Sequence, residues 1–187
     1  MSKYFRRQLA DYVEYHRDPW NCAMHVVGIV FLFLAAVLPL STWAVAPFGV
    51  QTSAATIAVL PVLFYWFLLD AALGTAIVGA AVVLLSAAAM IVNHTSSAVM
   101  WSITAALIVL GVAAQIVGHQ LFERRQPALV DNPTHLLLGP IFVMAKLFIA
   151  VGFRRDLAVV LQQAPQTTPQ SSLLYAEQRQ TESCPHA

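Results

Sequence analysis

Charged residues are nearly absent from the middle of this chain. Of its 187 residues, 59% are hydrophobic and 10% are Asp, Glu, Lys or Arg, whereas a typical soluble domain carries about 25% charged residues. Between Pro19 and Phe122 the only charged residue is Asp70. Apolar segments of that length cannot all be packed inside a soluble domain of this size. The composition therefore excludes an ordinary soluble protein and indicates an integral membrane protein.

Cysteines and basic clusters are scarce as well. The two cysteines, Cys22 and Cys184, form no spaced framework. We expect two free thiols, because Cys22 should lie near the cytoplasmic face, where disulfides rarely persist. A net charge of +1 without a basic stripe argues against nucleic acid as a partner. The chain also lacks a glycine-rich phosphate loop, a dinucleotide fingerprint and a nucleophile elbow.

Apolar runs predict an all-α membrane bundle. A helix that crosses a bilayer needs about 20 mostly apolar residues, and four runs are candidates: residues 22–40, 54–69, 71–92 and 98–118. A fifth and weaker run, residues 136–153, predicts a re-entrant or interfacial helix, with a fifth span as the alternative. The first run should remain as an anchor, since acidic and aromatic residues precede it rather than a short basic segment.

Two further segments flank the predicted bundle. Residues 4–16 carry apolar side chains at helical spacing with charged residues elsewhere, which predicts an amphipathic surface helix. After Gly152 the chain becomes rich in Gln, Pro, Ser and Thr, which is typical of a disordered tail. We therefore expect an amphipathic segment at 1–18, a transmembrane domain at 19–156 and a tail at 157–187.

The distribution of Lys and Arg predicts that both termini are cytoplasmic. Four basic residues precede the first apolar run, whereas the connections 41–53 and 93–97 contain none. Arg124 and Arg125 follow the fourth run and agree with this orientation. The membrane would be the inner membrane of a bacterium or the endoplasmic reticulum of a eukaryote.

The predicted topology places several polar residues at the same depth in the membrane. Four histidines fall at the predicted cytoplasmic edge: His16, His25, His119 and His135. The lone intramembrane carboxylate, Asp70, falls there too, whereas His94 lies on the opposite side and is expected to be an ordinary loop residue. Imidazole is the commonest metal ligand, so the gathering of these histidines predicts a shared metal ion.

A helix break explains how the first two histidines can meet. Asp18 is the expected N-cap of a new helix and Pro19 its first residue. In a continuous helix, nine residues would place His16 and His25 on opposite faces. The break lets the two rings face each other, with Asn21 on the same helix face as His25.

The second pair of histidines repeats this arrangement. His119 ends the fourth apolar run, and Glu123 follows one turn later on the same face. Asn132-Pro133 opens a helix that presents His135 in its first turn. A helix N-terminus disfavours imidazolium, so His135 should remain in the neutral form that binds metals.

Simpler interpretations of these residues stay open. An interfacial histidine is often only a hydrogen-bonded side chain, Asp70 could merely cap a helix, and Glu123 could pair with Arg124, Arg125 or Lys146.

Two non-enzymatic functions are alternatives: a haem-binding electron carrier with paired axial histidines, and a small transporter or scaffold in which Asp70 lines a polar path.

Three segments resemble one known family. They are "YHRDPWNCAMHVVG", "FLLDAALG" and "QIVGHQLFERRQPALVDNPTHLLLGPIFVMAK", which cover the chain from about Tyr15 to Gly152. The most specific piece is the Gly-His-x-x-x-Glu-[Arg/Lys]-Arg-x-Pro-Ala run. In these segments the sequence resembles the membrane-bound 2-hydroxy fatty acid dioxygenases. Lys146 departs from the acidic residue that the resemblance leads us to expect after "PIFVMA".

The resemblance implies an Fe(II)-dependent α-oxidation that shortens a 2-hydroxy long-chain fatty acid by one carbon and releases carbon dioxide. In fungi this serves sphingolipid breakdown from phytosphingosine. The implied partners are the hydroxy acid, dioxygen and membrane lipid, and a homo-oligomer is left open.

The hypothesised site combines this chemistry with the four clustered histidines. Its ligands are His16, His25, His119 and His135. Asp70 and Asn21 are expected to orient these ligands, and either Asp70 or Glu123 is an alternative ligand, because many iron oxygenases use two histidines and one carboxylate.

Overall fold

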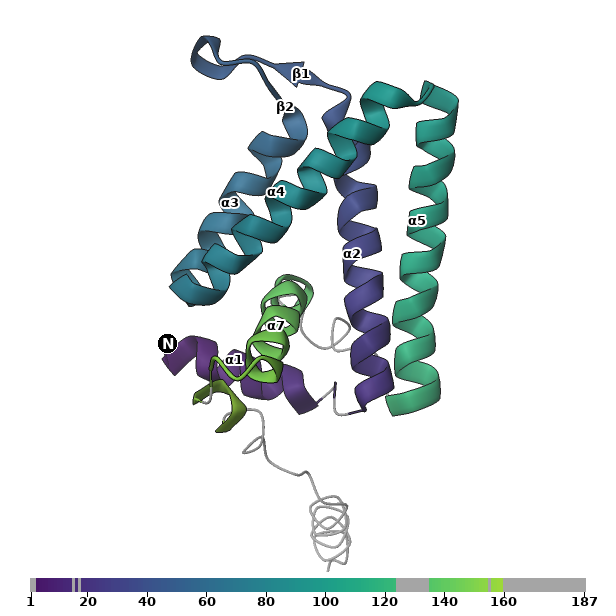
Figure 1. The fold of residues 1–187 in the computed structure, drawn as a ribbon. Coiled ribbons are helices and arrows are strands. Elements are labelled where there is room, and N and C mark those ends of the chain that lie inside the picture. The colour runs from purple at the N-terminus through teal and green to yellow at the C-terminus, as the bar shows by residue number, and fades with distance from the viewer. Residues whose placement is uncertain (1–2, 15, 17, 124–134, 155, 160–187) are drawn as a thin grey trace, which may run out of the picture.

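Four helices stand side by side, and two further helices lie across one end of them (Figure 1). The computed structural model describes residues 3–14, 16, 18–123, 135–154 and 156–159, without the side chains of Glu14, Glu123, His135 and Leu136. The helices are α1 (Lys3–Glu14), α2 (Pro19–Ser41), α3 (Ala54–Leu69), α4 (Ala71–His94), α5 (Ser97–Val117), the π-helical η2 (Gly118–Glu123) and α7 (His135–Ala150). Each apolar run of the sequence is thus helical, whereas the predicted tail lies almost entirely outside the described residues.

The start of α2 is fixed by its first residues. The side chain of Asp18 accepts hydrogen bonds from the backbone N–H groups of Trp20, at 2.7 Å, and Asn21, at 3.1 Å. Pro19 occupies the first helical position, where its missing N–H costs nothing. The predicted break between α1 and α2 is therefore confirmed.

The α3–α4 hairpin turns on Asp70. This residue ends α3 and caps α4, because its carboxylate accepts the N–H of Leu73 at 3.1 Å. Gly74 then permits the close return of the chain, since a Cβ at this position would meet the backbone of Phe67. The helix-capping interpretation of Asp70 is confirmed.

A short β-hairpin connects α2 to α3 and was not predicted from the sequence. It consists of β1 (Ala44–Val45) and β2 (Thr52–Ser53), paired antiparallel, with the 3₁₀ turn η1 (Pro47–Gly49) between them. Trp43 and Phe48 are exposed in this region, at 66% and 105%. Exposed aromatic side chains at the end of an apolar bundle are typical of a membrane–water interface.

Glycines allow α2 and α5 to approach closely. A Cβ at Gly28 would lie 3.0 Å from the carbonyl oxygen of Gly111, and a Cβ at Gly111 would lie 2.7 Å from Cγ of Leu32. Small residues at a helix crossing bring the two backbones together, as is common between helices in membranes. This contact fixes the distance between the helices that carry His25 and His119.

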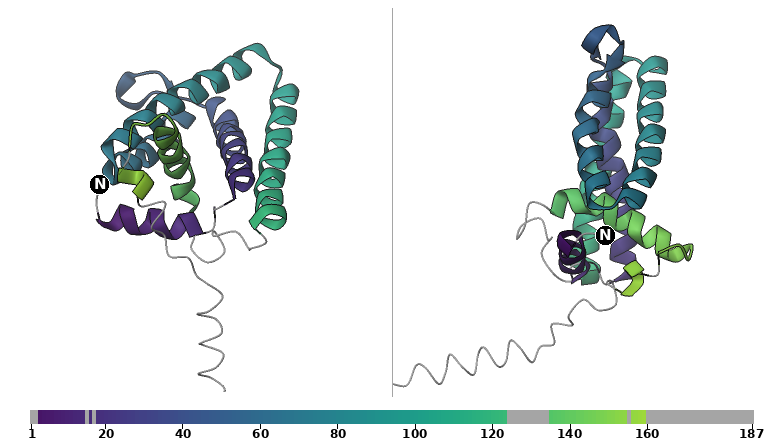
Figure 2. Two further views of the ribbon diagram at one scale, coloured as in Figure 1. Left: turned by 60° about the horizontal axis from the view of Figure 1, so that its bottom comes forward. Right: turned by 90° about the vertical axis from the view of Figure 1, so that its left-hand side faces the viewer.

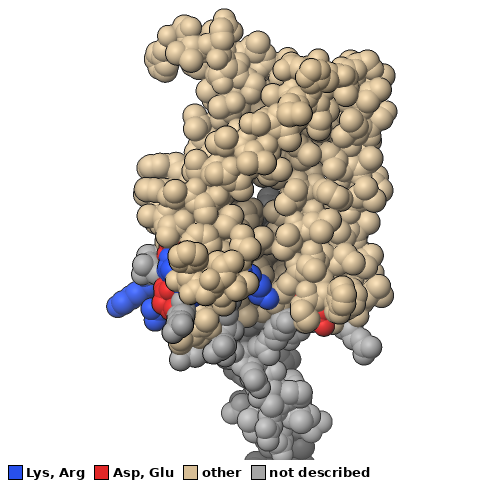
Figure 3. All heavy atoms as spheres, in the orientation of Figure 1, with Lys and Arg blue, Asp and Glu red and all other residues tan. Residues whose placement is uncertain are grey.

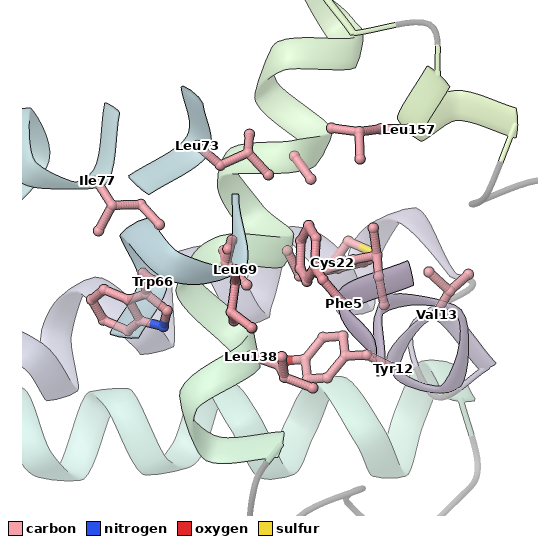
Figure 4. Close-up of a cluster of buried hydrophobic side chains, with 14 residues drawn as sticks. Phe5, Tyr12, Val13, Cys22, Trp66, Leu69, Leu73, Ile77, Leu138 and Leu157 are labelled. Carbon is pink, nitrogen blue, oxygen red and sulfur yellow. The ribbon is translucent and has the colours of Figure 1, made fainter. Parts of the chain in front are cut away.

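Helices α1 and α7 lie across the lower ends of the standing helices (Figure 2). The apolar face of α1 buries Phe5, Leu9 and Tyr12 against a cluster that includes Leu138 and Phe142 of α7 (Figure 4). The predicted amphipathic helix is therefore confirmed. The indole N–H of Trp66 in α3 also donates to the carbonyl oxygen of Leu137 at 2.6 Å, which ties α7 to the hairpin.

Within the part of the chain that the structure describes, three helical segments are long and apolar enough to cross a bilayer. They are Pro19–Ser41, Ala71–His94 and Ser97–Phe122, the last of which joins α5 to η2. α3 and the apolar part of α7 are shorter, so the number of four spans stays a prediction. The charged side chains visible in Figure 3 gather at the end where α1 and α7 lie. This one-sided distribution of charged side chains is compatible with a membrane protein that has one charged interface.

Candidate metal centre

His16 occupies the connection between α1 and α2. Its Nδ1–H donates to the carbonyl oxygen of Tyr12 at 2.9 Å, and its own backbone N–H donates to Val13 at 3.0 Å. Because a carbonyl can only accept, Nδ1 carries the proton in the neutral ring and Nε2 carries the lone pair. The hydrogen bond therefore selects the tautomer that presents Nε2 to a metal.

His25 and His119 approach from two adjacent helices. His25 lies in the second turn of α2, and His119 lies in η2 where α5 changes to π-helical geometry. Their Nε2 atoms are 3.0 Å apart and their rings are nearly perpendicular, at 83°. π-helical turns often occur at functional sites because they reposition a side chain.

The three histidines form one buried cluster. Their relative exposures are 1% for His16, 6% for His25 and 1% for His119. The ring of His16 lies 4.3 Å from that of His25 and 5.2 Å from that of His119, measured between centroids. One ligand nitrogen from each residue falls within 4.8 Å of the others. The predicted meeting of His16 and His25 across the bend is confirmed, and His119 joins them.

The distance between His25 and His119 fits two ligands of a single transition-metal ion. Two imidazole nitrogens bound at about 2.1 Å and 90° from one another are separated by about 3.0 Å, which matches the separation of the two Nε2 atoms in His25 and His119. Haem ligation fits less well, because two axial nitrogens on opposite sides of an iron would be about 4 Å apart with the macrocycle between them.

Aromatic rings cover the cluster on the side of α1 and α7. The ring of Tyr12 stacks on His16 at 4.1 Å and 7°, and Phe142 lies 5.6 Å from the same imidazole. Burial, followed by the nearby Cys22, raises the pKa of Tyr12 above its usual value. Its phenol therefore stays neutral beside His16. The sequence identified Tyr12 only as part of an apolar face.

The other predicted site residues have different outcomes. Asn21 is fully buried one turn before His25, and a Cβ at Gly118, next to His119, would meet its side-chain oxygen. The side chains of Glu123 and His135 lie outside the described residues, although the backbones of η2 and α7 include them. Their roles as ligands therefore stay predictions.

Asp70 has partners other than the histidines. Both of its carboxylate oxygens accept hydrogen bonds from Arg154 at 3.0 Å, in addition to the N–H of Leu73. Burial raises the pKa of Asp70, but the hydrogen bonds from Arg154 and Leu73 outweigh it and bring the pKa below its usual value. Within the described residues, the cluster of three or more possible ligands contains only histidines. This geometry indicates that Asp70 joins the hairpin to the segment after α7.

Two polar contacts near the cluster were not found from the sequence. The thiol of Cys22 donates to the carbonyl oxygen of His16 at 3.2 Å, and the ammonium of Lys146 donates to the Cys22 sulfur at 2.9 Å. Cys22 is a free thiol, as predicted, while Cys184 lies outside the described residues. His94 is the exposed last residue of α4 rather than a loop residue.

A predominantly helical, apolar chain with a buried cluster of imidazoles that could hold a metal ion defines a class of candidate metal-binding proteins compatible with a membrane. A model of the Mpo1-like family, described as 2-hydroxy-palmitic acid dioxygenase Mpo1-like, matches residues 2–151. The chain belongs to this family.

One curated relative supports this membership. The 2-hydroxy-palmitic acid dioxygenase MPO1 of Saccharomyces cerevisiae is 30% identical over 158 residues, which cover 84% of this chain and 87% of the yeast protein. No solved structure matches the chain. The predicted family resemblance is therefore confirmed.

Proposed function

We propose that this protein is an Fe(II)-dependent dioxygenase that converts a 2-hydroxy long-chain fatty acid into the acid one carbon shorter and carbon dioxide. The observation that carries the proposal is the buried cluster of His16, His25 and His119, whose ligand atoms lie within 4.8 Å of one another. The name of the yeast relative supplies the substrate class.

The three clustered histidines are the proposed iron ligands, and His135 is a proposed fourth. The Tyr12 carbonyl holds His16 in the required tautomer, and Asn21 packs beside the histidine-bearing turn η2. Neutral imidazoles suit non-haem iron, which when bound supplies coordination positions for dioxygen and for the substrate's oxygen atoms. Tyr12 and Phe142 exclude water from one side of the cluster.

The overall reaction balances without a further cosubstrate. One 2-hydroxy acid and one dioxygen give one shortened acid, one carbon dioxide and one water. The hydroxylated carbon and the carboxyl carbon together lose four electrons, which is the number that reduces dioxygen fully. The proposal therefore requires no binding site for 2-oxoglutarate, flavin or a nicotinamide.

The proposed topology brings the substrate to the site. We infer that α2, α3, α4 and α5 cross the membrane and that α1 and α7 lie along the cytoplasmic interface, with both termini on that side. An acyl chain partitions into a bilayer at about 0.8 kcal/mol per methylene, while its carboxylate stays at the interface. The histidine cluster lies where the end of α1, the start of α2 and the turn η2 meet, and the charged side chains visible in Figure 3 gather at the end where α1 lies. In a host that makes phytosphingosine, the reaction would serve degradation of this long-chain base.

The test is turnover by the purified chain. Anaerobically reconstituted with Fe(II), it should consume dioxygen and 2-hydroxyhexadecanoate and release pentadecanoate and carbon dioxide in equal amounts. His25→Ala and His119→Ala should abolish this turnover, while His94→Ala, an exposed histidine on α4, should not change it. Absence of turnover by the unmodified protein, or full activity of the first two variants, would refute the proposed function.

A further inference from the structure

Lys146 differs from the other described basic residues in what surrounds it. Lys3, Arg6 and Arg7 are exposed on α1, and Arg154 forms ion pairs with Asp70 and Asp156. Lys146 lies on α7, a helix of otherwise uncharged residues. Its ammonium contacts the Cys22 sulfur at 2.9 Å and lies 5.1 Å from the centroid of the Phe142 ring.

These contacts place the ammonium one side chain away from the histidine cluster. Cys22, which accepts its hydrogen bond, itself donates to the backbone of His16. Phe142, which faces the ammonium, also lies beside the His16 ring. Cys22 is one helical turn before His25, so the two side chains share a face of α2. Lys146 therefore approaches the cluster from the side of α7.

The present partners of this cation are weak. A thiol sulfur is a weak acceptor, and an aromatic face provides only a modest attraction. A carboxylate forms a shorter and roughly twice as strong charge-assisted hydrogen bond with an ammonium group. Among the carboxylates whose side chains the structure describes, which do not include Glu14 and Glu123, none forms a salt bridge with Lys146. A carboxylate brought by a ligand would therefore be preferred over the thiol.

We infer that Lys146 binds the carboxylate of the fatty acid substrate and so positions its 2-hydroxyl end at the histidine cluster. This inference rests on the proposed function. The four-carbon stem of lysine lets its point charge follow a carboxylate over a few ångströms. Figure 3 shows the surface hollowed between the α4 and α2 regions, with basic atoms at the lower edge of the hollow. An acyl chain in this hollow would keep its acidic head at the charged end.

The assignment predicts selection for the free acid. An ester, an amide or a thioester of the same fatty acid is neutral at this position and offers no carboxylate anion to Lys146. Lys146 would therefore select a free 2-hydroxy acid over its ester, amide or thioester by the charge of the carboxylate, whatever the length of the acyl chain.

The kinetic test compares Lys146→Met with Lys146→Arg. The methionine variant removes the charge but keeps most of the stem, and KM for 2-hydroxyhexadecanoate should rise about 10- to 100-fold, since a hydrogen bond to a charged group is lost. The effect on kcat should be smaller. The arginine variant should recover most of the affinity. Lys3→Met, which makes the same chemical change on the exposed face of α1, should leave KM unchanged.

A binding test separates this inference from the proposed reaction. Metal-loaded protein is titrated without dioxygen with 2-hydroxyhexadecanoate and with its methyl ester. The unmodified protein should prefer the acid, and Lys146→Met should lose this preference while retaining its metal and thermal midpoint. If the protein turns over but Lys146→Met keeps the KM and the preference, Lys146 is not the carboxylate site. If the preference depends on Lys146 but no turnover occurs, the proposed reaction is wrong and the acid-binding role stands.

Discussion

Replacing Gly28 by alanine should separate α2 from α5 at the level of the histidines. A Cβ at this position would lie 2.7 Å from Nε2 of Gln115 and 3.0 Å from the carbonyl oxygen of Gly111. The glutamine amide can move aside, but the carbonyl belongs to the α5 backbone. Gly28 lies one turn after His25, and Gln115 lies one turn before His119. The added methyl group therefore acts directly on the helix spacing that sets the His25–His119 distance.

The size of the effect follows from the contact distances. The 3.0 Å contact with the Gly111 carbonyl oxygen is closer than an ordinary van der Waals contact, so the α5 backbone must move away by a few tenths of an ångström to accommodate the methyl group. Overpacking of this kind costs about 1 to 3 kcal/mol of stability. The same displacement lengthens the 3.0 Å separation of the two Nε2 atoms. Disturbing the support of metal ligands typically reduces metal affinity by about 10- to 100-fold.

Two measurements test this prediction. Metal affinity is determined by titrating the metal-free protein in detergent, and stability by its thermal midpoint. Gly79→Ala is the matched control, because a Cβ at Gly79 meets nothing within 4 Å. It should bind metal as the unmodified protein does and gain up to about 1 kcal/mol from improved helix propensity. Equal metal affinity for Gly28→Ala and Gly79→Ala would refute the reasoning.

Three further predictions concern the elements around the site. Arg154→Ala leaves the buried Asp70 carboxylate without its ion pair and should cost about 2 to 4 kcal/mol, measured by chemical unfolding, whereas Asp156→Ala at the exposed end of the same network should cost less than about 1 kcal/mol. The pKa of Asp70 is lowered on folding, so its ion pair contributes stability above its ordinary pKa of 3.8. In the unmodified protein this contribution to the free energy of unfolding should be lost as the pH falls below 3.8. In Arg154→Ala the free energy of unfolding should change less over the same acidic range. Asp18→Ala removes two hydrogen bonds at the start of α2 and should cost about 1 kcal/mol, with faster amide exchange at Trp20 and Asn21 as the readout.

Local sequence signals predicted the helices and part of the site. Runs of apolar residues predicted α2 to α5 and α7, since backbone groups in hydrocarbon must be satisfied within the helix. Asp18 and Pro19 predicted the break that turns His16 toward His25. The orientation of the chain then placed His119 at the same depth.

The remaining features depend on how α7 packs, which no local pattern specifies. Lys146 meets Cys22 across 124 residues of chain, and Arg154 meets Asp70 across 84. Both contacts depend on the angle at which α7 lies against α1 and the hairpin. That angle is set by buried side chains such as Phe142 and Leu138, whose partners come from several elements. The sequence therefore identified Asp70 as a candidate functional residue, but its ion pair with Arg154 could be recognised only from the folded structure.

Metal stoichiometry tests the central claim most directly. The metal-free protein is incubated anaerobically with Fe(II), separated from unbound metal and analysed for iron per chain, together with His25→Ala, His119→Ala and the exposed control His94→Ala. The account predicts one iron per chain in the unmodified protein and the control, and almost none in the other two variants. An unmodified protein without iron, or full iron content after both cluster substitutions, would contradict it.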